Sequence, residues 1–172
     1  MRIGIPKSLY YYRYGHLWCA FFRALDCEVV LSPDTNKEFL TRGSKLSIDE
    51  SCLSLKIYLG HVQWLLERCD RIFVPRIANF GWTEKGIKKI CCPRFEALHD
   101  VVRNTFRADA DRILGCQIDY IDVNKSLGEH TEERAFLALG KALGKSRRET
   151  VAAFRRAKAA DAARQRERAD QQ

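Results

Sequence analysis

The sequence predicts one α/β domain with a mostly parallel sheet, because short apolar runs alternate along the chain with longer segments of helical periodicity. Its 172 residues suit a single compact domain. The composition is 46% hydrophobic and 10% aromatic, with 10 Gly and 4 Pro, which is far from the polar make-up of disordered chains. Most of the chain is therefore expected to fold.

The N-terminal segment predicts a strand, helix, parallel strand unit. Residues 2–6 form a short apolar run that Pro6 ends. Residues 10–25 then place aromatic and aliphatic side chains on a broad helical stripe, as in a helix packed on a sheet. Residues 27–31 give the second strand. A crossover helix between two such strands makes them parallel neighbours.

Two helices are expected next. Thr35 or Asn36 caps a short first helix. Ser47 and Glu50 have the spacing of a capping box and introduce a second helix with apolar positions up to Leu66.

The rest of the chain continues the alternation. The expected elements are strands over 71–75, 87–91, 113–115 and 120–123, an irregular stretch over 76–86, a helix that Pro93 starts, and helices over 131–143 and 147–168. Ligands of open parallel sheets bind at the loops that leave the carboxyl ends of the strands. Those loops are expected at residues 6–8, 32–36, 75–79 and 92–94.

Charge is concentrated at the C-terminus. The net charge is +8, and residues 145–172 hold nine Lys and Arg against four acidic residues. Acids and Ala interleave at helical spacing there, and aromatics for base stacking are lacking, which disfavours nucleic-acid binding. The sequence also lacks an apolar run of membrane-spanning length and an N-terminal export signal, so we expect no membrane span and a cytoplasmic location.

The seven cysteines point to thiols or metal ligands, since an odd number without an export signal disfavours a disulfide framework. Cys52 is expected about two residues inside the helix that Ser47 and Glu50 introduce, where free amides and the helix dipole favour a thiolate. Cys92 directly precedes Pro93 at the next helix start, so the two thiols could share a metal. Packing is the preferred explanation for the cysteines within elements or at strand ends: Cys19, Cys27, Cys69 and Cys116.

Five ordered blocks resemble the acyl-CoA dehydratase activase-related proteins, which are relatives of the 2-hydroxyglutaryl-CoA dehydratase subunits. The blocks are residues 1–15, 27–38, 49–56 with 60–62, 73–76 and 92–95, and the resemblance extends to about residue 165. It implies a Rossmann-like, three-layer α/β domain over residues 1–145. It also implies that the basic helix over 146–172 starts a second domain that this chain lacks.

The same resemblance implies an iron-sulfur site. Cys52 and Cys92 would help to hold a 4Fe-4S cluster, in a family tied to anaerobic radical dehydration and low-potential electron transfer. Related dehydratase subunits use three cysteines and leave one iron open. Only two cysteines match the blocks, so the third ligand would be Cys91 or Cys116, or would come from a segment outside this chain.

Three basic residues lie in or beside the strand-end loops and the Cys52 helix: Lys7, Lys56 and Arg76. We expect at least two of them to line the cluster cavity, where positive charge stabilises thiolates, an anionic cluster or the phosphate of an acyl-CoA. The sequence thus predicts an iron-sulfur-binding module that acts in electron transfer or as a dehydratase accessory. The alternative is a non-catalytic α/β fragment or binding module that docks a second domain, a second copy or a dehydratase or activase partner through its C-terminal helix.

Overall fold

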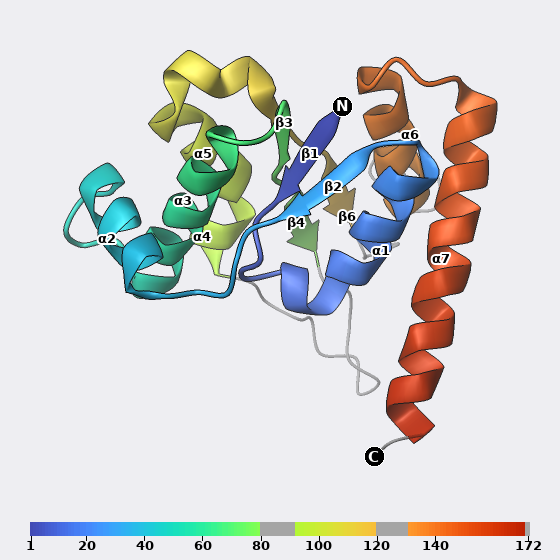
Figure 1. Ribbon diagram of the computed structural model, residues 1–172, viewed down its shortest axis with the longest axis horizontal. Coiled ribbons are helices and arrows are strands. Elements are labelled where there is room, and N and C mark those ends of the chain that lie inside the picture. The colour runs from blue at the N-terminus through green and yellow to red at the C-terminus, as the bar shows by residue number, and fades with distance from the viewer. Residues whose placement is uncertain (80–91, 120–130, 171–172) are drawn as a thin grey trace.

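The fold is a three-layer α/β domain, as expected (Figure 1). The structure is a computed structural model and describes residues 1–79, 92–119 and 131–170. Four parallel strands form the main sheet in the order β2-β1-β3-β5: β2 (Glu28–Leu31), β1 (Arg2–Ile5), β3 (Arg71–Phe73) and β5 (Ile113–Leu114). The strand, helix, strand unit at the N-terminus is therefore confirmed.

A two-stranded parallel ladder extends the sheet beyond a break. β4 (Arg76–Asn79) follows β3 directly, and β6 (Gln117–Asp119) follows β5. The amides of Val74 and Arg76 bond to the carbonyls of Leu114 and Cys116 across the break. Residues 76–79 are thus a strand, and the irregular stretch expected there is wrong at its start. The edge strand expected over 87–91 and the strand expected over 120–123 lie outside the described residues.

Helices cover both faces of the sheet (Figure 1). On one face lie α1 (Tyr11–Ala24), α6 (Glu132–Ala142) and α7 (Arg147–Asp170), and we call the apolar cluster beneath them the α1-side core. On the other face lie α3 (Leu53–Leu66) and α5 (Leu98–Thr105), over what we call the α3-side core. The remaining helices are α2 (Lys37–Leu46), which packs against α3, the short α4 (Pro93–Glu96) and the 3-10 helix η1 (Arg107–Arg112).

Aromatic rings join the layers of the α1-side core. The ring of Phe73 on β3 lies 5.3 Å from that of Trp18 and 5.1 Å from that of Phe22, both on α1. Phe136 on α6 lies 4.7 Å from Phe21 and 5.1 Å from Phe154 on α7. Each buried ring of this size contributes about 1.5–3 kcal/mol by leaving water. These contacts fix α1, α6 and α7 as one layer.

The C-terminal helix is attached to the body over its first three turns. Its Thr150, Ala153, Phe154 and Ala157 are buried against α1 and α6, whereas residues 162–170 are exposed. Only the second half of the helix therefore extends beyond the buried contacts. The domain boundary expected near residue 146 stays a prediction. No helix in the described part of the chain has the length and apolarity needed to cross a membrane.

Candidate functional site

The topology predicts a ligand site at the carboxyl edge of strands β1 and β3. The chain leaves β1 into α1 on one face, and helices α4 and α5, after β3, lie toward the other face. In the strand order 2-1-3, this reversal makes the β1/β3 edge the place where open α/β sheets bind ligands. Because only four residues separate α3 from β3, the N-terminus of α3 also lies at this edge. Cys52 is located there.

Cys52 and Cys92 hold equivalent positions, each as the N-cap residue of a helix. Cys52 precedes α3 and Cys92 precedes α4; both have extended backbone conformations, and neither side chain bonds to the helix that it precedes. Cys52 is half-buried and Cys92 is exposed. Both sulfurs are therefore available at helix N-termini, where unpaired amides favour negative charge.

The expected capping box is wrong. Ser47 ends α2 as its C-cap, and α3 begins at Leu53 rather than after Ser47. Asn36, one of the two caps proposed for the preceding helix, is confirmed, since its side chain accepts the amides of Glu38 and Phe39 at 2.8 and 3.4 Å. Cys52 is thus the cap itself and not a residue within the first turn.

Two contacts join the segments that carry the cysteines to the rest of the edge. The Arg94 guanidinium on α4 donates to the Glu50 carbonyl at 3.3 Å, two residues before Cys52. The Phe95 ring lies edge-on to Tyr10, at 6.4 Å between centroids, in the turn that leads into α1. The starts of α1, α3 and α4 therefore meet around one region of the edge.

The three basic residues expected at the site have different partners. Lys7 pairs with Asp34 at 2.5 Å, and this hydrogen bond raises the pKa of the Lys7 ammonium. Lys56, in the first turn of α3, donates to the Asp49 carbonyl at 3.0 Å, beside the Cys52 segment. Arg76 forms an ion pair with Asp100. The described contacts do not bring these three side chains into one group, and their cluster-lining role stays a prediction.

Arg76 lines a cavity of about 210 Å³ that sequence reasoning missed. Its other lining residues include His99 and Cys116. The His99 ring bonds to the Val74 carbonyl at 2.9 Å through Nδ1, and burial lowers the pKa of His99. Gly115 makes room for it, because a Cβ there would lie 2.2 Å from the ring. The isolated Gly115 between two apolar strand segments is the only sequence signal of this close approach.

His61 is fully buried between the residues that follow β2 and the first turn of α2. Its Nδ1 lies 2.8 Å from Ser32 Oγ and its Nε2 3.0 Å from Thr35 Oγ1, and its ring stacks on Phe39 at 3.9 Å. Ser32 Oγ also accepts the Lys7 amide at 2.8 Å. Burial lowers the pKa of His61 to about 4, so this histidine is neutral at pH 7. It joins the loops after β1 and β2 to α3.

The described residues do not identify the third ligand expected for a cluster. In the described ranges, no group of three His, Cys, Asp or Glu side chains is placed to hold a metal ion. Cys116 packs against the α1-side core and Cys52 against the α3-side core, and burial raises the pKa of the Cys116 thiol far above its usual value. Cys116 and Cys52 thus pack against the cores on opposite faces of the sheet, and Cys116 as the third ligand stays a prediction. Cys91 lies outside the described residues.

Comparison with known proteins identifies a family. The family model described as CoA enzyme activase uncharacterised domain matches residues 2–172. No curated protein and no solved structure matches the chain.

Proposed function

The chain belongs to the CoA enzyme activase uncharacterised domain family, and from that premise we propose that it is an iron-sulfur-binding module of a 2-hydroxyacyl-CoA dehydratase system. Its role is low-potential electron transfer or that of a dehydratase accessory. A family tied to CoA enzyme activation suggests a dehydratase as its partner. The observation that carries the proposal is the equivalent N-cap placement of Cys52 and Cys92.

The donor set fits a cluster edge. Thiolates are the ligands that iron-sulfur clusters use, and neither sulfur is bonded as a helix cap. Hydrogen-bond donors near the sulfurs stabilise the negative charge of a cluster and its thiolates. The unpaired amides at the start of a helix are donors of this kind. When bound, the cluster would supply one-electron transfer. Two protein thiolates leave the other iron positions to Cys91, a partner or a further ligand.

The surroundings of Cys52 favour a protein partner at this edge. Ile48 is 72% exposed and Leu53 is 58% exposed, although both are large apolar side chains. They lie four residues before and one residue after Cys52. Electron transfer needs close approach of a second protein, and apolar side chains at the rim favour such contact. We propose that the dehydratase partner covers Ile48 and Leu53.

Basic side chains beside the two cysteines support the proposal. Lys56 lies one turn after Cys52 on α3, and Arg94 lies two residues after Cys92. Both donate to backbone carbonyls of the 49–50 segment, which holds them beside the cysteines. Their charge would stabilise thiolates and an anionic cluster. Lys7 and Arg76 would serve the phosphate of an acyl-CoA at the same sheet edge.

Anaerobic reconstitution tests the proposal. The wild type, Cys52→Ser and Cys92→Ser are reconstituted with iron and sulfide, desalted and assayed for both per chain. Cys27→Ser and Cys69→Ser are matched controls, because both cysteines are buried within the body. We expect the wild type to hold a cluster that chelators remove readily, and either site variant to lose most of its iron. Equal iron in Cys52→Ser and Cys27→Ser would refute the ligand assignment.

A wild type that binds no cluster, and whose α7 surface nevertheless captures a dehydratase or activase, would favour the second function, a binding module without a cofactor. The cheap discriminator is the visible absorption of the reconstituted protein. An iron-sulfur chromophore that disappears in Cys52→Ser and Cys92→Ser supports the first function.

A further inference from the structure

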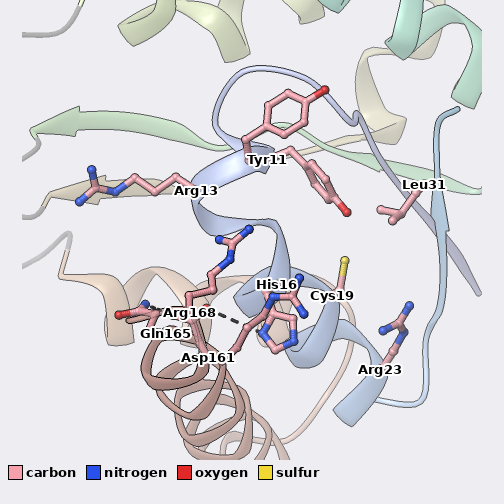
Figure 2. A pocket seen from close by; sticks show the side chains of 11 residues that line it. Tyr11, Arg13, His16, Cys19, Arg23, Leu31, Asp161, Gln165 and Arg168 are labelled. Carbon is pink, nitrogen blue, oxygen red and sulfur yellow. Dashed lines mark hydrogen bonds and ion pairs between the residues drawn. The ribbon is translucent and has the colours of Figure 1, made fainter. Parts of the chain in front are cut away.

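A second hollow lies between α1 and the exposed half of α7. It has a volume of about 250 Å³ and is bounded at one side by Leu31, the last residue of β2. Figure 2 shows its labelled side chains: His16 of α1 faces Asp161 of α7, whereas Arg13 and Arg23 point in opposite directions from α1. Its lining runs along α1 from Tyr11 and Tyr12 in the first turn to Arg23 in the last turn.

The lining is strongly basic. Arg13 and Arg23 come from α1, and Arg164 and Arg168 come from α7, where a spacing of four puts them on one face. Asp161 is the one carboxylate among the lining residues. Both of its oxygens are engaged: Oδ1 lies 3.8 Å from His16 Nδ1, and Oδ2 accepts Gln165 Nε2 at 2.7 Å.

The four guanidinium groups have no carboxylate partner within the part of the chain that the structure describes. The ion pairs of the structure involve other basic residues, and Arg13 instead lies 5.3 Å from the centre of the Tyr14 ring. Like charges held near one another repel unless an anion joins them. The hollow thus concentrates donors and positive charge without supplying the anion.

Tyr11 adds a neutral donor that is held in place. Its ring lies over Gly15, where a Cβ would come within 2.3 Å of the ring. Burial raises the pKa of Tyr11, and the charges of Arg164 and Arg23 act on the same hydroxyl in the opposite direction. The phenol is therefore protonated at neutral pH and can donate a hydrogen bond beside the arginines. Burial likewise keeps the neighbouring Cys19 a neutral thiol, because it raises that pKa.

We propose that this hollow binds a diphosphate group through Arg23, Arg164 and Arg168, with Tyr11 as a further donor. Arg13 points away from these groups in Figure 2. Guanidinium groups match the paired oxygens of phosphates, and several of them suit an anion with more than one charge. A hollow of about 250 Å³ is smaller than sites for whole drug-sized ligands, which limits the enclosed part to a diphosphate. The diphosphate is either free or the exposed end of a nucleotide. This site is independent of the proposed cluster.

Calorimetric titration with pyrophosphate at 150 mM NaCl tests the site on the full chain. The site variant is Arg164→Gln with Arg168→Gln. The matched control is Arg155→Gln with Arg166→Gln, which removes the same charge from the same helix at exposed positions outside the hollow. We expect the site variant to bind pyrophosphate at least about tenfold more weakly and the control to stay within about twofold. Tyr11→Phe should weaken binding by a smaller factor.

Parallel titrations with phosphate and ADP identify the source of the group. Tighter binding of pyrophosphate than of phosphate supports a diphosphate site, and binding of ADP equal to or tighter than that of pyrophosphate assigns it to a nucleotide. Two results would overturn the proposal: no saturable binding of pyrophosphate by the wild type, or equal loss of binding in the site variant and the control. Circular dichroism of each variant establishes that the helices are intact.

Discussion

The crossing of α2 and α3 depends on two glycines, and replacing them gives a sharp test of the packing. A Cβ at Gly60 would lie 2.0 Å from the Phe39 carbonyl oxygen, and one at Gly43 would lie 1.6 Å from that of Lys56. Ordinary contacts of this kind begin at 3.4 Å. Both obstacles are backbone atoms, so no side-chain rotation relieves the clash. In Gly60→Ala the helices must separate by more than 1 Å.

The expected cost follows from two opposing effects. Overpacking costs about 1–3 kcal/mol, and a backbone obstacle puts Gly60→Ala at the upper end. Alanine returns about 1 kcal/mol through its higher helix propensity. We therefore expect a net loss of about 2 kcal/mol for Gly60→Ala and for Gly43→Ala. Both contacts join the same pair of helices, so one separation relieves both, and the double variant should lose less than the sum.

Urea unfolding followed by circular dichroism measures these losses. Ser44→Ala is the control, because Ser44 is exposed on α2 beside Gly43 and should shift the free energy of unfolding by less than about 0.5 kcal/mol. The separation would also disturb the stack of His61 on Phe39. A Gly60→Ala protein as stable as the wild type, or a fully additive double variant, would refute the close packing.

Two further predictions concern α7 and His61. Phe154→Ala should lower the free energy of unfolding by about 3 kcal/mol, because the Phe154 ring is buried against Phe136. Removal of residues 147–172 should lower the urea midpoint of unfolding at least as far as Phe154→Ala does. An unchanged midpoint in either protein would contradict the packing of α7. The folded pKa of His61, about 4, lies below its usual 6.5. The unfolded chain therefore binds the extra proton, and stability present above pH 6.5 is lost as the pH falls towards 4. The protonation of this histidine alone should lower the free energy of unfolding by about 2 kcal/mol between pH 7 and pH 5. His61→Gln should flatten the dependence of stability on pH in that range. An equal slope in both proteins would contradict the prediction.

The elements with regular periodicity could be predicted from the sequence. The apolar stripe over 10–25 and the runs over 2–6 and 27–31 fix the first strand, helix, strand unit, and the structure confirms it. The helix boundaries near polar turns could not be predicted as closely. Ser47 and Glu50 satisfy a capping pattern locally, but α3 begins at Leu53, because capping depends on backbone conformation that spacing alone does not determine.

Features made by distant residues had no local signal. The burial of α7 depends on Phe136 and on α1, more than a hundred residues earlier, and the thin apolar face of the helix does not reveal it. The break at Pro75 likewise resembled the end of a strand, although the ladder resumes at Arg76 through its bond to Cys116. The helix starts at Cys52 and Cys92 could be located approximately from flanking residues such as Pro93. Their grouping around one edge depends on contacts such as that of Arg94 with Glu50.

The proposed cluster site is tested most directly by locating iron in a crystal of the anaerobically reconstituted protein through its anomalous scattering. We expect an iron-sulfur cluster at the N-termini of α3 and α4, bonded to the sulfurs of both Cys52 and Cys92, which then lie within about 7 Å of each other. Iron absent from this edge, or the two sulfurs on opposite faces of the sheet, would contradict this expectation.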